Sequence, residues 1–149
     1  MIPITTVRVI LEDDLERILM LKRANGSYNA GAWSLPGGKV DYNASLEKTC
    51  REEVYEETGL ELENLRYLFH RENLPKHNGE KHCMTHYFTA DYKGTPKINE
   101  SESSAAKWIH PDEIFLYRTA FDNDIGIRQF RELKGREKTD YYLDLVVSY

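Results

Sequence analysis

Four glutamates, Glu52, Glu53, Glu56 and Glu57, lie close together just before Gly59. They fall in the last turns of a helix that we expect to follow a turn rich in glycine and containing a proline. Residues three and four apart share a helix face, so Glu53, Glu56 and Glu57 repel one another by roughly 0.2–0.5 kcal/mol per pair. The helix macrodipole also disfavours anions near a C-terminus. A hard divalent cation held by carboxylate oxygens would offset both penalties, so this spacing predicts a metal site.

The segment from Gly38 to Leu60 resembles the Nudix box, whose pattern is G-x5-E-x7-R-E-U-x-E-E-x-G-U, with U a bulky aliphatic residue. The chain departs from the pattern at Ala44, where the pattern has glutamate, and at Glu52, where it has arginine. The positions that match are Gly38, Glu53, Val54, Glu56, Glu57, Gly59 and Leu60. By this resemblance the chain is identified as a member of the Nudix hydrolase (MutT-like) family.

The resemblance implies a metal-dependent hydrolase that cleaves the pyrophosphate bond of a nucleoside diphosphate linked to another group. Nucleoside triphosphates, nucleotide sugars and ADP-ribose all belong to this class, and the sequence does not separate them. Glu53, Glu56 and Glu57 would act as metal ligands and catalytic residues, with the Gly38 backbone as a further metal ligand. Mg²⁺, or Mn²⁺ in its place, would neutralise the diphosphate oxygens and activate a bound water.

The general base must come within hydrogen-bond reach of that water. In the family it comes either from the box or from a later loop. Glu100 and Glu102 lie in such a loop, shortly before the strand expected around Trp108. We prefer Glu102 as the catalytic residue, and the alternative is that both acids are solvated.

The replacement of arginine by Glu52 matters, because in the family this arginine is thought to orient the neighbouring glutamate. Arg51 would point away from Glu53 at about 100° per residue, and Lys48 is placed to pair with Glu52. A cation near Glu53 must therefore come from elsewhere in the chain. Together with Ala44, this departure leaves an alternative function: a catalytically impaired Nudix domain acting as a nucleotide-binding or regulatory module.

Three basic residues are candidates for substrate binding. Lys39 follows the Gly-Gly turn, and Arg8 and Arg23 lie on the first two expected strands, which border the ligand cleft in the family. The alternative for each is a solvated cation. Aromatic side chains can stack on a nucleobase, although most aromatics belong to the core; the candidates are Tyr28, Trp33, Tyr87 and Phe121.

The order of expected elements predicts an α/β protein. Strands are expected at residues 4–11, 17–23, 33–35, 62–71, 82–92, 107–110 and 141–147, and helices at 45–58, 111–116 and 122–133. The first two strands would form a hairpin, Ser45 would cap the acidic helix, and Gly59 would end it. The resemblance implies a Nudix-type α/β/α sandwich around a mixed sheet.

Length and composition are typical of a soluble globular protein. The 149 residues fit one domain, residues 1–149, and the hydrophobic and charged fractions are 40% and 30%. A net charge of −5 argues against nonspecific binding to a nucleic acid polymer, and no apolar run approaches a membrane span. We therefore expect a cytoplasmic protein with a small-molecule nucleotide as its partner, and a homodimer is plausible by family resemblance.

The histidines and cysteines show no metal-binding spacing. His82 and His86 would lie on one face of a strand, about 13 Å apart, which is too far for shared ligation. We interpret them as structural or surface residues. Cys50 and Cys83 are expected to be buried, reduced thiols.

Overall fold

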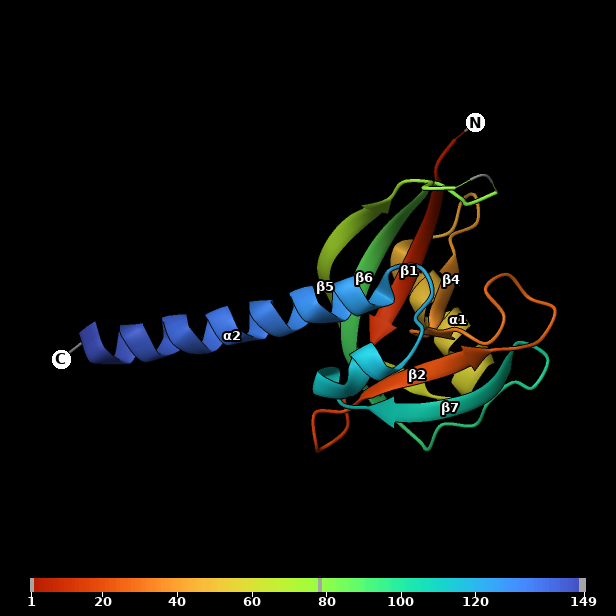
Figure 1. Ribbon diagram of the computed structural model, residues 1–149. Coiled ribbons are helices and arrows are strands. Elements are labelled where there is room, and N and C mark those ends of the chain that lie inside the picture. The colour runs from red at the N-terminus through yellow and green to blue at the C-terminus, as the bar shows by residue number, and fades with distance from the viewer. Residues whose placement is uncertain (1, 78, 148–149) are drawn as a thin grey trace.

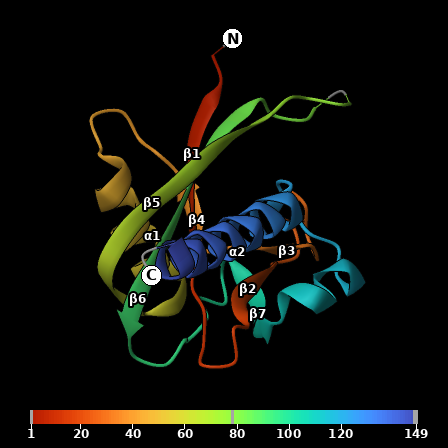
Figure 2. The same ribbon diagram turned by 90° about the vertical axis from the view of Figure 1, so that its left-hand side faces the viewer.

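The computed structural model describes residues 2–77 and 79–147 (Figure 1). Its larger sheet has the order β4-β1-β6-β5, formed by β1 (Ile4–Ile10), β4 (Gly37–Lys39), β5 (Glu61–Asn73) and β6 (Cys83–Lys93). The pair β1–β6 is parallel, whereas β1–β4 and β5–β6 are antiparallel, so this sheet is mixed. Both long strands, β5 and β6, curve around one side of the molecule in Figure 2.

A smaller sheet has the order β3-β2-β7, formed by β2 (Ile18–Arg23), β3 (Trp33–Ser34) and β7 (Ser103–Ile109). The expected hairpin between the first two strands is therefore wrong, because β1 and β2 belong to different sheets. At the turn between them, the structure has the bridge Glu12↔Ile18 and backbone hydrogen bonds from Leu19 N–H to the Leu11 carbonyl and from Asp13 N–H to the Arg17 carbonyl. Each strand instead finds a partner far along the chain. Strand β4 was not expected from the sequence.

The acidic helix is α1 (Leu46–Thr58), and both of its predicted ends are confirmed. The Ser45 hydroxyl accepts a hydrogen bond from the Lys48 N–H, and Gly59 ends the helix in the left-handed conformation at φ 73°. Cys50 and Val54, both fully buried, pack against Val7 and Val9 of β1. This contact fixes α1 on one face of the larger sheet.

The second long helix, α2 (Asn123–Val147), begins near its predicted start but continues to Val147. Its first turns place Ile127 and Phe130 against Ile10 and Tyr87, on the sheet face opposite α1. Figure 1 shows its C-terminal part projecting away from the sheets. The strand expected at 141–147 is therefore wrong: each residue added to an existing helix gains a hydrogen bond at little entropic cost, so the helix propagates.

The remaining elements follow the sequence closely. A 3-10 helix, η1 (Pro111–Leu116), stands where a short helix was expected. Cys50 and Cys83 are buried and free. Within the part of the chain that the structure describes, no helix is long and apolar enough to cross a membrane. The mixed sheet between α1 and α2 confirms the predicted α/β/α arrangement.

The close approach of β4 to β1 generates a testable prediction. Gly37 has a φ of 151°, and a Cβ there would lie 2.0 Å from the Val7 carbonyl oxygen. We expect Gly37→Ala to lower the free energy of unfolding by about 2–4 kcal/mol, because the backbone of one strand must move. Gly135→Ala is the comparison variant, because a Cβ at Gly135 would meet nothing within 4 Å and replacing a glycine inside α2 should raise the free energy of unfolding by about 0.5–1 kcal/mol. Urea denaturation of the two variants measures the difference, and equal midpoints would contradict the prediction.

Candidate functional site

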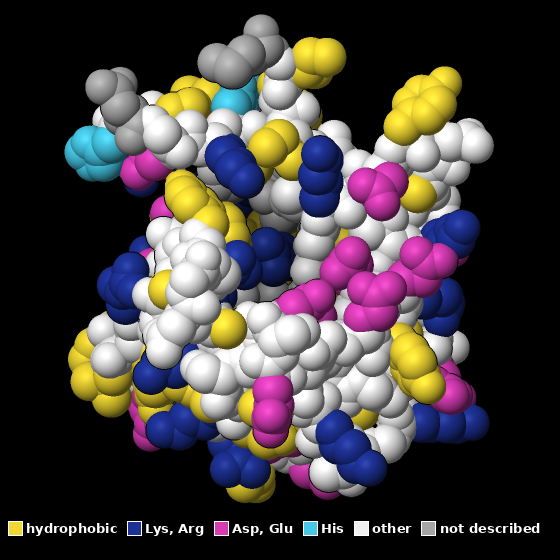
Figure 3. All heavy atoms as spheres, turned by 90° about the vertical axis from the view of Figure 1, so that its right-hand side faces the viewer, with side chains coloured by type: hydrophobic (Ala, Val, Ile, Leu, Met, Phe, Trp, Pro, Cys, Tyr) yellow, Lys and Arg dark blue, Asp and Glu magenta, His cyan; other side chains and the backbone are white. Residues whose placement is uncertain are grey.

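A cavity of about 590 Å³ lies where the two sheets approach each other. Its walls come from β1, β2, β4, β6, the loops after β2 and β5, and the segment before α2. Figure 3 shows a hollow with basic side chains inside and acidic side chains gathered along one edge. The charged residues in the lining are Arg8, Arg23, Lys39, Glu57, Lys76, Glu80, Lys81, Glu102 and Asp122.

The acidic edge is built by α1 and by the Gly37–Gly38 pair of β4. Glu57 accepts a hydrogen bond of 2.9 Å from the Gly37 N–H, and only 8% of the residue is exposed. A Cβ placed on Gly38 would lie 2.8 Å from the carboxyl carbon of Glu53. The absence of a side chain at Gly38 therefore lets the Glu53 carboxylate lie directly against β4. These two contacts explain why two glycines precede an acidic helix at this spacing.

Burial and mutual repulsion disfavour the charged forms of these acids. Burial raises the pKa of Glu57 to about 8, although the positive charge of Arg8 and the Gly37 N–H favour its ionised form. Burial also raises the pKa of Glu53 to about 6, with further contributions from Glu56 and Glu102. Glu102 therefore lies within electrostatic range of the box acids, as a loop acid directed at the site would. Two carboxylates that resist ionisation are chemically suited to a divalent cation, which would supply the missing positive charge.

The described residues contain no group of three or more His, Cys, Asp or Glu side chains already arranged to hold a metal ion. The donor set nonetheless fits a hard cation. Glu53 and Glu57 lie against neighbouring glycines of β4, Gly38 leaves space beside Glu53, and both acids have a raised pKa. Glu56 is exposed on the same stretch of helix.

Glu52 lies outside this cluster. It forms an exposed ion pair of 3.7 Å with Lys48, as the helical spacing predicted. Arg51 does not approach the acids and donates a hydrogen bond to the Leu62 carbonyl. Of the two positions that depart from the box pattern, position 52 therefore contributes a solvated acid.

Arg8 is the cation that favours ionisation of both Glu53 and Glu57, although the sequence suggested it only as a substrate-binding candidate. In the β1–β4 ladder Arg8 lies opposite Gly37, whose N–H binds Glu57. Arg8 is 5% exposed, donates from Nη1 to the Leu35 carbonyl, and has no hydrogen-bond partner at Nε. Burial lowers its pKa, and Glu57 opposes that shift. No local sequence signal identifies this role, because it depends on the register between two strands.

Phe121 lies between the two candidate arginines of the cavity. The guanidinium carbons of Arg8 and Arg23 lie 4.5 and 5.0 Å from the centre of its ring. Phe121 and Asp122 both have positive φ, at 56° and 52°. This corner is fixed by Asn73, whose Nδ2 donates to the Asp122 carboxylate at 2.7 Å and to the Phe121 carbonyl at 3.3 Å. Sequence reasoning missed Asn73 and Asp122, because nothing in their local pattern marks them.

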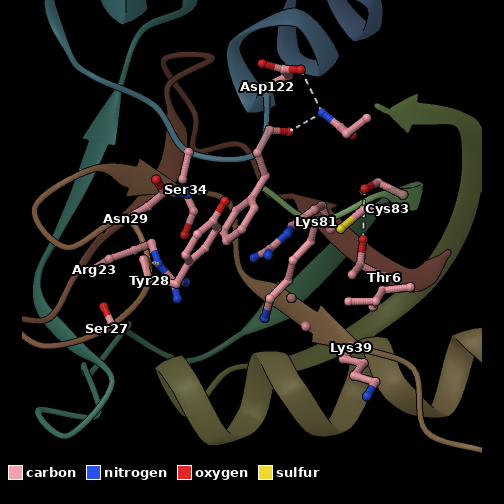
Figure 4. Close-up of a pocket in the computed structure, with 18 of the residues that line it drawn as sticks. Thr6, Arg23, Ser27, Tyr28, Asn29, Ser34, Lys39, Lys81, Cys83 and Asp122 are labelled. Carbon is pink, nitrogen blue, oxygen red and sulfur yellow. Dashed lines mark hydrogen bonds between the residues drawn. The ribbon is translucent and has the colours of Figure 1, made fainter. Parts of the chain in front are cut away.

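Figure 4 shows how the remaining candidates lie around the cavity. Arg23 and Tyr28 come from one side, and the Arg23 Nε donates to the Tyr28 carbonyl at 2.6 Å. Lys81 comes from the other side, with its Nζ 5.5 Å from the centre of the Tyr28 ring. Lys39 is exposed at the edge nearest α1. Lys81 was not among the sequence-predicted residues.

The aromatic candidates divide into two groups. Tyr28 and Phe121 line the cavity, and Tyr28 is 40% exposed. Tyr87 is fully buried, and its hydroxyl accepts a hydrogen bond from Asn123. Trp33 packs edge-on against Tyr117 at 5.6 Å. Only the first pair is therefore available to a ligand in the cavity.

Comparison with known proteins gives a consistent result. A family model described as "NUDIX domain" matches residues 3–130. A putative 8-oxo-dGTP diphosphatase of Bacillus subtilis (strain 168) is 30% identical over 111 residues, covering 73% of this chain and 68% of that protein. A MutT-like protein of Streptomyces ambofaciens is 28% identical over 74% of this chain, which spans 66% of its length.

Among solved structures, the NUDIX domain of Shewanella oneidensis NrtR complexed with ADP ribose has a TM-score of 0.74 and 26% identity. The similarity covers 89% of this chain and 88% of that one. The acidic helix that follows Gly37 and Gly38 is consistent with the family model and with these relatives. This chain belongs to the Nudix family.

Proposed function

We propose that the protein is a Mg²⁺-dependent hydrolase that cleaves the pyrophosphate bond of a nucleoside diphosphate linked to another group. One observation carries this proposal: Glu53 and Glu57 converge on Gly37 and Gly38 of β4, at the edge of a cavity whose interior is cationic. Carboxylates at the edge suit a metal, and cations inside suit a phosphorylated substrate. The two requirements of metal-assisted phosphoryl chemistry thus lie side by side.

Glu53, Glu57 and, less centrally, Glu56 would hold the ion, with the Gly38 carbonyl as a further ligand. Mn²⁺ would also suit these oxygen donors. When bound, the metal would neutralise phosphate oxygens and lower the pKa of a coordinated water. The chain itself keeps Glu57 in place through the Gly37 N–H and offsets its charge with Arg8.

The basic side chains of the cavity support an anionic substrate. Among the described residues, Arg8, Arg23, Lys39 and Lys81 make no ion pair with a carboxylate. The buried Arg8 guanidinium interacts with Glu57 only at longer range and leaves its Nε without a hydrogen-bond partner, so a phosphate oxygen would provide a direct charged partner. Arg8 and Arg23 would contact the substrate inside the cavity, and Lys39 would do so at its edge.

The relatives suggest two substrate classes. A putative 8-oxo-dGTP diphosphatase suggests a nucleoside triphosphate, and a neighbour complexed with ADP ribose suggests a nucleoside diphosphate sugar. We expect Tyr28 and Phe121 to contact the nucleobase in either case, because they are the aromatic side chains that line the cavity.

Homodimer formation and a cytoplasmic location stay predictions.

A substrate panel tests the function directly. We expect metal-dependent cleavage of at least one nucleoside triphosphate, nucleotide sugar or ADP-ribose, and a fall in kcat/KM of at least about 100-fold in Glu57→Gln, because a metal ligand is lost. Glu52→Gln is the matched control on the same helix, since Glu52 is exposed and pairs with Lys48. Products are identified by chromatography. Nucleotide binding without turnover across the panel would favour a catalytically impaired nucleotide-binding module instead.

The general base is tested by a second variant. Glu102 lines the cavity and interacts electrostatically with Glu53 and Glu57, whereas Glu100 does not line it. We expect Glu102→Gln to lower kcat by about 10²–10⁴-fold with little change in KM, because a base acts in the chemical step. Glu100→Gln is the control in the same loop. Steady-state kinetics that show equal kcat for both variants would remove Glu102 from the mechanism.

The raised pKa of Glu57 predicts how stability depends on pH without metal. The folded protein binds a proton there up to about pH 8, whereas the unfolded chain releases it near 4.5, so stability is lost as pH rises through this range. The glutamine in Glu57→Gln cannot ionise. As the pH rises from 5 to 9, the free energy of unfolding of this variant should therefore increase by roughly 2–4 kcal/mol relative to that of the wild type. Urea unfolding in a chelator measures this difference. A difference that stays constant over this pH range would contradict the prediction, and Mg²⁺ should stabilise the wild type more than the variant at pH 8.

A further inference from the structure

Two histidines outside the cavity lie directly opposite each other on neighbouring strands. His70 of β5 and His86 of β6 are partners in the antiparallel ladder. Their ring centres are 5.9 Å apart, with an angle of 46° between the ring planes. His70 is exposed and His86 is partly exposed, so solvent reaches the pair. Sequence spacing did not suggest it, because the partners belong to different strands.

The distance between the rings suits one shared metal ion. A metal bound to an imidazole nitrogen lies about 2.0–2.1 Å from it. Each ring centre would therefore be about 3.2 Å from the ion, so the two centres would be roughly 5.2 Å apart at a tetrahedral angle and roughly 6.4 Å apart if the two nitrogens lay on opposite sides of the ion. The separation of 5.9 Å lies between these two values, so small rotations of the side chains would bring both nitrogens onto one ion without movement of the strands.

Tyr67 provides the second contact that a histidine ligand requires. Its hydroxyl lies 2.9 Å from the Nδ1 of His86. The Tyr67 ring packs edge-on against Phe88 at 5.2 Å, which fixes the hydroxyl. Metal-binding histidines typically use one ring nitrogen for such a contact, which sets the ring orientation and leaves Nε2 for the metal. Partial burial, together with the neighbouring His70, lowers the pKa of His86, which favours the neutral form that ligates.

The pair is separate from the acidic site. Side chains alternate along β6, so His86 lies on the face opposite Thr85 and Tyr87, and Thr85 is the one that lines the cavity. The described residues add no third metal-binding side chain, so water would complete the coordination. Imidazole nitrogens favour Zn²⁺, Ni²⁺ and Cu²⁺ over Mg²⁺, which prefers oxygen.

We propose that His70 and His86 form a transition-metal site, oriented by Tyr67, on the β5–β6 surface. The ion it takes is Zn²⁺, Ni²⁺ or Cu²⁺. Occupation would join the two strands through a side-chain link in addition to their backbone hydrogen bonds. The site is independent of catalysis at the acidic helix.

Zinc titration of the full chain tests this proposal. In calorimetry with Mg²⁺ in excess and in the Glu57→Gln background, which weakens zinc binding by the carboxylates, we expect one zinc site. His70→Ala and His86→Ala should each weaken it at least tenfold, and Tyr67→Phe should weaken it by about tenfold or more. His77→Ala is the control, because His77 is an exposed histidine in the loop after β5.

Two readouts distinguish a metal site from a structural effect. Zinc should shift the side-chain nitrogen resonances of His70 and His86 in NMR spectra and leave those of His77 unchanged. Thermal unfolding without zinc shows whether each variant is folded. Zinc binding that survives in both histidine variants, equal weakening in His77→Ala, or unshifted His70 and His86 resonances would each overturn the proposal.

Discussion

The hydrogen bond from the Gly37 N–H to Glu57 is the contact on which the site depends. It joins Gly37, the first residue of β4, to the end of α1, and Gly37 packs directly against Val7 because it has no side chain. The same ladder places Arg8 opposite Gly37, which brings a guanidinium to the buried carboxylate. One close approach of two strands therefore sets the positions of the acid, its hydrogen-bond donor and its counter-ion.

This arrangement holds the carboxylates at a cost in stability. Glu57 is buried and Glu53 is partly buried, and both resist ionisation because the nearby positive charge does not compensate fully for lost solvation. The fold keeps them together through α1, whose Cys50 and Val54 are anchored in the core. The energy of that packing thus maintains a charge arrangement that a divalent cation would stabilise, and the site is organised before any metal binds.

The local part of the site could be predicted from the sequence, and the non-local part could not. Helical spacing alone places Glu53 and Glu57 together, Ser45 and Gly59 mark the helix ends, and Glu52 pairs with Lys48 as expected. The expected hairpin was wrong and β4 was missed, because strand pairing depends on distant segments of the chain. The strand expected at 141–147 was wrong because α2 continues through these residues. Arg8 beside Glu57, the corner at Asn73 and the facing His70 and His86 all depend on strand register, which a single sequence does not specify.

Glu52 stands where the box pattern has arginine, and in this fold the positive charge beside the acids comes from Arg8 on β1 instead. A cation within the helix would have to share a face with Glu53, whereas Arg8 reaches the acids from β1. Arg8 is held in place because it is buried, donates a hydrogen bond to the Leu35 carbonyl and lies over the Phe121 ring. A side chain at an exposed helix position would be held less rigidly. Position 52 is thereby left free to face solvent. A departure inside a local motif consequently does not by itself imply lost chemistry when the compensating charge comes from another element.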